Sequence, residues 1–293
     1  MKILILGASG MVGNAIFQVL SNDYEVYGTF NRNKPGNSSY SREKYWLKYD
    51  IAEAATLSDI LEDIKPDLVI SSLTGNFEHQ LNAHKQMAEY LKKSSGRCIF
   101  ISTLNVFDGS TAGDHTEDVP PYPISTYGRY KRDCEKLLQE YLESNLLIVR
   151  LPKILSKTRA QEMIEQVESG QPVFSNLYMN LNTAENVAKA VKYCIEAGIF
   201  GILHLASHDY MSFDETTRRL FAYANKAPQY IAAKLTTQSY CSLLGCDDPA
   251  SLKCSDDGNF YLTIRSINAD ISVRFGISCE EVIDLLGTVS GTV

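Results

Sequence analysis

The amino-acid sequence predicts a doubly wound α/β fold, in which helices cover both faces of a parallel β-sheet, together with a smaller C-terminal α/β lobe. Short apolar runs alternate with amphipathic helical patterns through the first half of the chain. The apolar residues within each run are continuous, which is typical of strands buried on both faces. The first run leads straight into a glycine-rich turn and a helical pattern, as the first strand of such a sheet does.

The elements of this sheet can be placed in order along the first 151 residues. The first strand, KILILG, is followed by a helix that carries Ile16, Phe17 and Leu20 on or near one face. The same alternation of strand and helix then repeats. We expect strands at 2–7, 25–30, 47–51, 67–73, 97–102 and 145–151, and helices at 14–22, 56–64, 78–94 and 127–144.

The alternation is less regular after residue 152, which indicates a smaller lobe interleaved with returning segments of the first domain. We expect the first domain to comprise 1–152 and segments near 184–210, and the lobe to comprise 153–183 and 211–293. Helices are predicted at 160–170, 184–198, 212–227 and 278–287, and strands at 201–207, 230–235 and 259–264.

The composition is that of a globular protein with an acidic balance. Of the 293 residues, 44% are hydrophobic and 22% are charged, and the net charge is −7. This charge disfavours a nucleic-acid partner, whose phosphates need a basic surface. No run approaches the roughly 20 apolar residues of a membrane span. Seven scattered cysteines without C-x-x-C spacing favour a reducing compartment and give no metal-ligand pattern. We therefore expect a cytoplasmic protein with no membrane association and no bound metal.

The glycine-rich turn at 7–13, GASGMVG, joins the first strand to the first helix. Glycines at this spacing let the backbone turn tightly and approach a pyrophosphate, which the free N–H groups of the helix N-terminus then bind. The turn therefore predicts a Rossmann-like dinucleotide-binding domain. The residues expected to hold the dinucleotide here are Gly7, Ser9, Gly10, Met11, Val12 and Gly13.

The end of the second strand bears on which dinucleotide binds. Enzymes that use NAD place an acid there to hold the ribose 2′-hydroxyl, whereas an Arg accommodates the 2′-phosphate of NADP. Here the strand ends in TFNRN, which has no acid and contains Arg32. A guanidinium pairs well with phosphate oxygens, so we expect NADP(H), with NAD as the alternative.

Two hydroxyl residues, Ser102 and Thr103, stand where the strand at 97–102 ends. Ligands lie at this edge of a parallel sheet, so Ser102 is expected near the cofactor. Tyr127 and Lys131 follow in TYGRYK, one helical turn apart and facing the same way. The Y-x-x-x-K pattern also occurs at 40–44 and 230–234, but only the pair at 127–131 opens a helix between two predicted strands.

The chemistry of Thr103, Tyr127 and Lys131 suits the reduction of a carbonyl group. A free phenol has a pKa of roughly 10, and a nearby ammonium is expected to lower the pKa of Tyr127. Tyr127 then donates a proton to the carbonyl oxygen as a hydride arrives from the nicotinamide. Thr103 is expected to orient the substrate oxygen. Lys131 is expected to hold the nicotinamide ribose as well.

Together these residues resemble the extended short-chain dehydrogenase/reductases, particularly the dTDP-4-dehydrorhamnose reductase-like branch. The resemblance is strong to about residue 151 and looser afterwards. It implies a nucleotide-sugar substrate and a homodimer, since members of this family are frequently dimers. It also implies cofactor contacts from Asp50 and Ile51 of YDI and from Leu73 and Thr74. The segments that carry it are GASGMVG, ISTLNVFDG (101–109), TEDVPPYPISTYGRYK (116–131) and GILHLAS (201–207).

The chain departs from the family pattern at two places. Leu104 and Asn105 replace an Asp-Tyr pair, and we expect Asn105 to contact the substrate. Residues 256–257 are both Asp where the family often carries Arg-Pro. An acid beside a diphosphate repels it. A cation for the diphosphate could instead come from Lys153, which we place at the substrate, or from Arg265. The alternative is that each is an ordinary charged residue at the surface or at the edge of the core.

The leading hypothesis is an NADPH-dependent reductase of a nucleotide-linked keto sugar of the 4-keto-6-deoxy type, with Tyr127 as proton donor. One alternative is an epimerase or dehydratase of the same superfamily. Dehydratases add an acid pair after the Thr, and Leu104 and Asn105 are not acids. The other alternative is a non-catalytic NADP-binding regulatory subunit, because the altered positions would fit lost catalysis.

Overall fold

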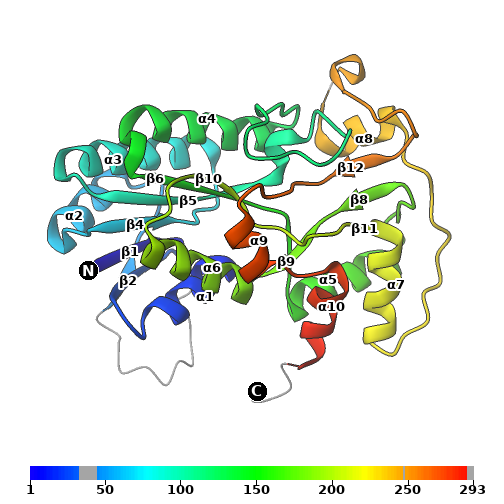
Figure 1. Cartoon of the computed structure of the whole chain (residues 1–293), viewed down its shortest axis with the longest axis horizontal. Coiled ribbons are helices and arrows are strands. Elements are labelled where there is room, and N and C mark those ends of the chain that lie inside the picture. Colours follow the sequence, from blue (N-terminus) through cyan, green and yellow to red (C-terminus); the bar gives the residue numbers. More distant parts are fainter. Residues whose placement is uncertain (33–44, 247, 289–293) are drawn as a thin grey trace. The chain divides into compact units, whose positions relative to one another are not determined.

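The computed structural model of the protein describes residues 1–32, 45–246 and 248–288 (Figure 1). Two compact units share the chain, and each is assembled from separate segments. The first unit consists of Met1–Ser102, Tyr130–Arg150 and Ala184–Leu203. The second consists of Thr103–Arg129, Leu151–Thr183 and His204–Val293.

The first unit is built on a seven-stranded parallel sheet with the order β10-β6-β5-β4-β1-β2-β3, which confirms the predicted fold class. Ile3 of β1 pairs with Val26 of β2 on one side and with Leu68 of β4 on the other. The strand order therefore reverses between β1 and β4, and sheets of this kind bind ligands at the carboxyl ends of the strands there. The strands are β1 (Lys2–Leu6), β2 (Glu25–Phe30), β3 (Trp46–Lys48), β4 (Leu68–Ser71), β5 (Arg97–Thr103), β6 (Leu146–Leu151) and β10 (Gly201–His204).

Helices cover both faces of this sheet. Figure 1 shows α2, α3 and α4 on one face and α1 and α6 on the other. The side chains that α2, α3 and α4 turn inward belong to one apolar cluster with β1, β4 and β5. The helices are α1 (Met11–Leu20), α2 (Ala54–Ile64), α3 (Phe77–Ser94), α4 (Thr126–Leu142) and α6 (Ala184–Ala197), and a short 3₁₀ helix, η3 (Glu143–Asn145), follows α4.

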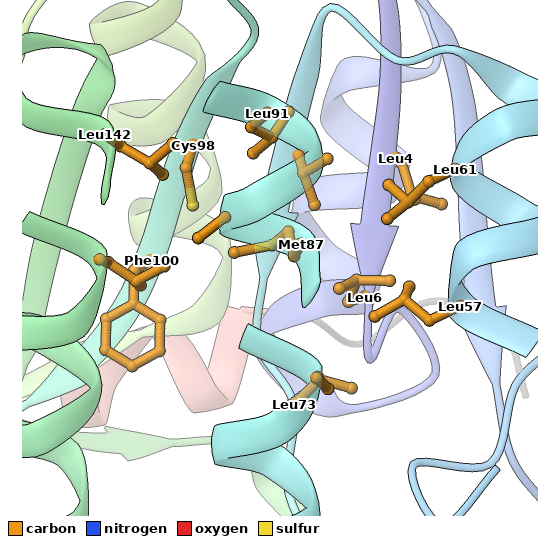
Figure 2. Close-up of a cluster of buried hydrophobic side chains, with 14 of the residues drawn as sticks. Leu4, Leu6, Leu57, Leu61, Leu73, Met87, Leu91, Cys98, Phe100 and Leu142 are labelled. Atoms are coloured by element: carbon orange, nitrogen blue, oxygen red, sulfur yellow. The ribbon is translucent and has the colours of Figure 1, made fainter. Parts of the chain in front are cut away.

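The apolar cluster holds the carboxyl ends of β1 and β4 in place. Leu4 of β1 packs toward Leu61 of α2, Leu6 packs toward Leu57, and Leu73 lies just past the end of β4 (Figure 2). Burying each such side chain contributes roughly 1.5–3 kcal/mol to stability. The other labelled members of the cluster are Met87, Leu91, Cys98, Phe100 and Leu142.

The second unit contains two small sheets, with the orders β11-β8-β12 and β7-β9. Its helices α5, α7 and α10 share an apolar cluster with these strands. Neither unit contains, within the described residues, a helix with the length and apolar character of a transmembrane segment. The elements are η2 (Leu104–Phe107), β7 (Lys153–Leu155), α5 (Lys157–Glu168), β8 (Leu177–Met179), β9 (Leu181–Thr183), β11 (Met211–Ser212), α7 (Phe213–Tyr223), α8 (Thr237–Leu244), η4 (Pro249–Ser251), β12 (Phe260–Leu262), α9 (Ala269–Phe275) and α10 (Cys279–Thr288).

The strand predicted at 230–235 is wrong. Only Ala233 in this segment forms a bridge, an isolated one with Phe174. The Asn176 side chain takes the place of a strand partner, because its amide accepts from Leu235 N at 2.7 Å and donates to Leu235 O at 3.0 Å. The segment is therefore held by this single bridge and one side chain rather than by a ladder, and Ile231 is left 95% exposed.

Candidate functional site

The turn between β1 and α1 has the backbone geometry that the sequence predicts. Gly7 has a φ of +79°, and a Cβ built there would lie 2.7 Å from the Ser72 carbonyl oxygen, so only glycine fits. Its N–H donates to Thr29 Oγ1 at 2.9 Å, and its carbonyl accepts from the Ser72 hydroxyl at 3.2 Å. The turn is thus held between β2 and the end of β4.

The first turn of α1 presents backbone amides at this point. Gly10 is the N-cap residue and brings no side chain that could accept from them. Met11, Val12 and Gly13 form the first turn, so the predicted residues contribute N–H groups and a close approach rather than side chains. Such a helix end binds phosphate through these N–H groups and the positive end of the helix dipole.

A pocket of about 160 Å³ opens beside the glycine turn. Tyr49 lines it and is only 3% exposed, yet its hydroxyl has no hydrogen-bond partner within the described residues. Buried hydroxyls are almost always paired, so an unpartnered phenol in the wall of this pocket needs an explanation. The pocket is lined by Gly7, Ser9, Gly10, Thr29, Phe30, Asn31, Tyr49, Ile51, Leu73 and Thr74.

A second, wider pocket of about 580 Å³ shares Phe30 and Asn31 with the first. It adds the cations Arg32 and Lys48, and Lys48 is the β3 partner of Phe30. It also contains two carboxylates, Asp50 and Glu53. One oxygen of Asp50 already accepts from the Ala52 amide at 3.0 Å.

These two pockets fit the adenosine half of a dinucleotide. The glycine turn and the first turn of α1 would hold the pyrophosphate. Arg32 and Lys48 would face a 2′-phosphate, while Asp50 and Glu53 offer acceptors for ribose hydroxyls. The structure thus brings together the predicted cofactor residues at 7–10, 32, 50–51 and 73–74.

The carboxyl end of β5 is held by a buried polar network. Ser102 donates its hydroxyl to Glu135 Oε1 at 2.5 Å. Arg150 donates to the same carboxylate from Nε at 3.1 Å and from Nη2 at 2.7 Å. The Ser102 hydroxyl, predicted to lie at the cofactor, is therefore directed into the protein and ties β5 to α4 and β6.

Lys131 is not the solvated surface lysine that its sequence position alone would favour, because it is only 5% exposed. Its Nζ donates to the Ile101 carbonyl at 3.0 Å and lies 4.7 Å from the centre of the Phe100 ring. Burial lowers the pKa of Lys131 to about 8, although Cys134 and Glu135 raise it. The ammonium is thus held under the end of β5 with a modest preference for the charged form at neutral pH.

Of the other two Y-x-x-x-K pairs, the one within the described residues does not rival Tyr127 and Lys131 in placement. The pair at 230–234 lies in the segment without helix, and the Tyr230 hydroxyl donates to Asp214 Oδ1 at 2.8 Å. The pair at 40–44 falls outside the described residues.

Thr103 and Tyr127 are brought together by folding. A hydrogen bond joins their side chains, although 24 positions separate them in the sequence. Thr103 also donates to Asn105 Oδ1 at 3.0 Å and accepts from the Asn105 N–H at 3.2 Å, which caps the 3₁₀ helix η2. Asn105, predicted to contact substrate, is thereby a partner of Thr103.

The pKa of Tyr127 is raised above its usual value rather than lowered as predicted. Desolvation of the phenol is the largest influence, and the hydrogen bond with Thr103 acts in the opposite direction. The phenol therefore stays protonated at neutral pH. This is the state that a proton donor requires.

The start of α4 is clamped against the loop that follows Thr103. A Cβ built on Gly128 would lie 2.3 Å from the Asn105 carbonyl oxygen, so the helix approaches this loop as closely as a backbone can. Asp108 accepts from Ile124 N at 2.7 Å and also binds the Ser125 hydroxyl. Ser125 in turn accepts from Gly128 N at 2.9 Å. These contacts hold Tyr127 in the first turn of α4.

Lys153, Arg265 and Asp257, the charged residues that bear on binding of a substrate diphosphate, each have different neighbours. Lys153, in β7, lies 5.4 Å from the Phe213 ring, and burial together with Arg159 lowers its pKa. Arg265 lies 3.9 Å from the Asp114 carboxylate, with both side chains exposed. Asp257 accepts from the Tyr261 hydroxyl at 2.7 Å and organises its own turn. Lys153 is thus a partly desolvated cation in the second unit.

Sequence reasoning missed Tyr49, Lys48 and the pair of Glu135 and Arg150. Arg150 did leave a signal, because a charged residue inside the apolar strand LLIVRL needs a buried partner. Lys48 and Tyr49 stand beside the predicted Asp50, but nothing local distinguishes them from ordinary strand residues.

Comparisons with known proteins agree with this architecture. A family model described as "RmlD substrate binding domain" matches residues 1–242. The methionine adenosyltransferase 2 subunit beta of Rattus norvegicus is 28% identical over 190 residues, which cover 62% of this chain but only 55% of that protein. The dTDP-4-dehydrorhamnose reductase of Burkholderia thailandensis is 25% identical over 234 residues, covering 71% of this chain and 73% of that protein.

A solved structure supports the same assignment at the level of the fold. The dTDP-4-dehydrorhamnose reductase of Bacillus anthracis, in complex with NADP, superposes with a TM-score of 0.72 at 16% identity, covering 98% of this chain and 97% of that chain. Together with the family model, which spans most of the sequence, this confirms the resemblance seen in the motifs. The chain belongs to the RmlD substrate binding domain family.

Proposed function

We propose that the chain is an NADPH-dependent reductase of a nucleotide-linked 4-keto-6-deoxy sugar, with Tyr127 as the proton donor. The observation that carries the proposal is the hydrogen-bonded pair of Thr103 and Tyr127, which folding assembles where β5 ends and α4 begins. The glycine turn of the same chain has the geometry for a pyrophosphate. The name of the relative from B. thailandensis, dTDP-4-dehydrorhamnose reductase, describes a reaction that fits both features.

The cofactor proposed is NADPH, with NADH as the alternative. Arg32 and Lys48 in the wider pocket favour a 2′-phosphate, and the NADP complex of the B. anthracis reductase fits this choice. The residues proposed to hold the cofactor are Gly7, Ser9, Gly10, Met11, Val12, Gly13, Arg32, Asp50, Ile51, Leu73, Thr74, Tyr127 and Lys131.

The proposed chemistry divides between the cofactor and the side chains. NADPH, when bound, supplies the hydride that adds to the carbonyl carbon. Tyr127 donates its phenol proton to the carbonyl oxygen, so the ketone becomes an alcohol. Thr103 orients the substrate oxygen beside Tyr127, and Lys131 holds the nicotinamide ribose as an ammonium.

The two units are proposed to divide the ligands between them. The unit with the seven-stranded sheet would bind the dinucleotide, and the unit with β8 and β12 would bind the sugar nucleotide through Lys153 and Asn105.

We propose a cytoplasmic location because all seven cysteines are free thiols. The homodimer implied by the family resemblance is tested by light scattering, and a particle with the mass of one chain would contradict it.

The experiment is an assay of NADPH consumption with a panel of dTDP-4-keto-6-deoxy sugars. We expect NADPH to be consumed and the C4 alcohol to appear in equal amounts. A dTDP sugar that already carries an alcohol at C4 is the matched control and should give no signal. Failure of every ketone in the panel to oxidise NADPH would overturn the proposed reaction.

A second candidate is a non-catalytic NADP-binding subunit. The hydroxyl proton of Thr103 is directed to Asn105, a residue that departs from the family's reductase pattern. The relative from R. norvegicus is named as a subunit of methionine adenosyltransferase. Replacing Tyr127 with Phe separates the candidates: a binding subunit would keep its biological function, whereas a reductase would lose it.

A further inference from the structure

We propose that Tyr49 is a nucleotide-binding residue, whose hydroxyl donates a hydrogen bond to the adenosine half of the dinucleotide. The inference rests on the proposed cofactor and adds a residue that no motif of the sequence indicates. It starts from the unpaired hydroxyl beside the glycine turn.

The position of Tyr49 points to a ligand rather than to a packing role alone. The residue lines the same pocket as Gly7, Gly10 and Leu73. It is 3% exposed, and its hydroxyl finds no partner among the described residues. A phenol that only filled the core would be replaced without loss by a phenylalanine, because an unpaired buried hydroxyl costs free energy.

The ring of Tyr49 is anchored, so the hydroxyl stays where it is. The side chain belongs to the apolar cluster that includes Leu4 and Leu57, whose packing Figure 2 shows. The Tyr49 N–H donates to the Phe30 carbonyl at 2.8 Å and ties the backbone to the end of β2. The hydroxyl is therefore preorganised, and a ligand that meets it need not order it.

The protonation state of Tyr49 defines what the hydroxyl can recognise. Burial raises the pKa of Tyr49 to about 12, and the carboxylate of Asp50 acts in the same direction. The group is thus a neutral phenol at physiological pH and can donate one hydrogen bond. The adenosine half of the cofactor carries suitable acceptors in its phosphate oxygens, its ribose oxygens and its ring nitrogens.

The proposal predicts opposite effects on stability and on binding when only the hydroxyl is removed. The variant Tyr49→Phe should raise the melting temperature of the free protein or leave it unchanged, because it deletes an unpaired buried group. The same variant should weaken NADPH binding roughly five- to tenfold, which corresponds to one hydrogen bond. If Tyr49 had only a structural role, removing its hydroxyl would not weaken NADPH binding while the melting temperature stayed the same or rose.

Tyr240→Phe is the matched control. Tyr240 is also 3% exposed, but its hydroxyl donates to the Asp108 carbonyl at 3.0 Å in the second unit. Removing this paired hydroxyl should lower the melting temperature. It should leave the affinity for NADPH unchanged.

The experiment combines thermal unfolding of the free proteins with calorimetric titration of NADPH, AMP and nicotinamide mononucleotide. We expect Tyr49→Phe to weaken NADPH and AMP by the same factor and to leave nicotinamide mononucleotide unaffected. Equal AMP affinity in wild type and variant would overturn the inference, since the hydroxyl would then meet only water. A fall in melting temperature like that of the control would also overturn it. If wild type binds neither NADPH nor AMP, the proposed cofactor itself fails.

Discussion

Arg150 and Glu135 form a fully buried ion pair, with Nη2 of the arginine 2.7 Å from Oε2 of the glutamate and exposures of 1% and 3%. The pair joins β6 to α4, and the Ser102 hydroxyl adds β5 to the same carboxylate. Three elements, two of which carry proposed site residues, thus converge on one charge. Burying two charges is costly, so the pair is evidence of a precise arrangement more than of added stability.

Removing one member of this pair should be far more damaging than removing both. Arg150→Met leaves a buried carboxylate unpaired and should lower the free energy of unfolding by about 3–5 kcal/mol. The double variant Glu135→Gln/Arg150→Met should recover most of that loss, because no buried charge remains. Urea unfolding measures both values. A double variant as unstable as Arg150→Met would show that the loss comes from packing and not from charge.

Lys131 should make stability depend on pH in the alkaline range. Its pKa is lowered from 10.5 to about 8 in the folded protein, so between these values the unfolded chain binds more protons than the folded one. Stability due to Lys131 therefore rises with pH across that window. The difference in unfolding free energy, wild type minus Lys131→Met, should increase by about 3 kcal/mol from pH 8 to 10.5. A difference that stays flat or falls would contradict this assignment.

Arg32 and Lys48 should both select the phosphorylated cofactor. Either Arg32→Met or Lys48→Met should raise the Kd for NADPH about tenfold, the effect of one lost charge-assisted hydrogen bond. The Kd for NADH should stay within about twofold, because the 2′-phosphate is the group that these cations meet. Lys93→Met, an exposed lysine at the end of α3, is the control. Equal losses of affinity for NADPH and NADH would show that the two cations contact a part of the cofactor other than the 2′-phosphate.

Gly128 should be needed for the placement of Tyr127. The Cβ of Gly128→Ala would lie 2.3 Å from the Asn105 carbonyl, so the first turn of α4 must move away from the loop after Thr103. We expect reductase activity to fall by about 100-fold, as small displacements of reacting groups commonly cause. NADPH affinity and circular dichroism should change little. Full activity in Gly128→Ala would mean that this close approach has no role in positioning the phenol.

The sheet could be predicted because its signals are local. β2 covers Glu25–Phe30, as the run EVYGTF predicts, and β5 begins at Arg97, the first residue of the predicted strand. Continuous apolar runs between helical patterns leave few alternatives for such strands. The glycine turn and the spacing of Tyr127 and Lys131 are local in the same way.

The second unit could be predicted only in part, because distant residues define it. β8 and β12 have three residues each, too few for a periodic signal, and Asn176 ties the segment before β8 to Leu235 through its side chain. The apolar run at 230–235 therefore looks like a strand but has no ladder to join.

The pKa shift of Tyr127 and the burial of the Tyr49 hydroxyl could not be predicted from the sequence, because they too depend on distant residues. The direction of the Tyr127 pKa depends on how strongly the fold desolvates the phenol, and the spacing to Lys131 carries no information on this. Tyr49 is recognisable only once its hydroxyl is seen to be buried without a partner.

The most direct test of the account is the single-turnover rate of ketone reduction by Tyr127→Phe preloaded with NADPH. Without the phenol proton, the rate should fall by about 10²–10⁴ relative to wild type, the usual contribution of general acid catalysis. The Kd for NADPH should change far less than the rate, because the other residues proposed to hold the cofactor stay in place. A Tyr127→Phe protein that reduces the ketone at the wild-type rate would contradict the assignment of Tyr127 as proton donor.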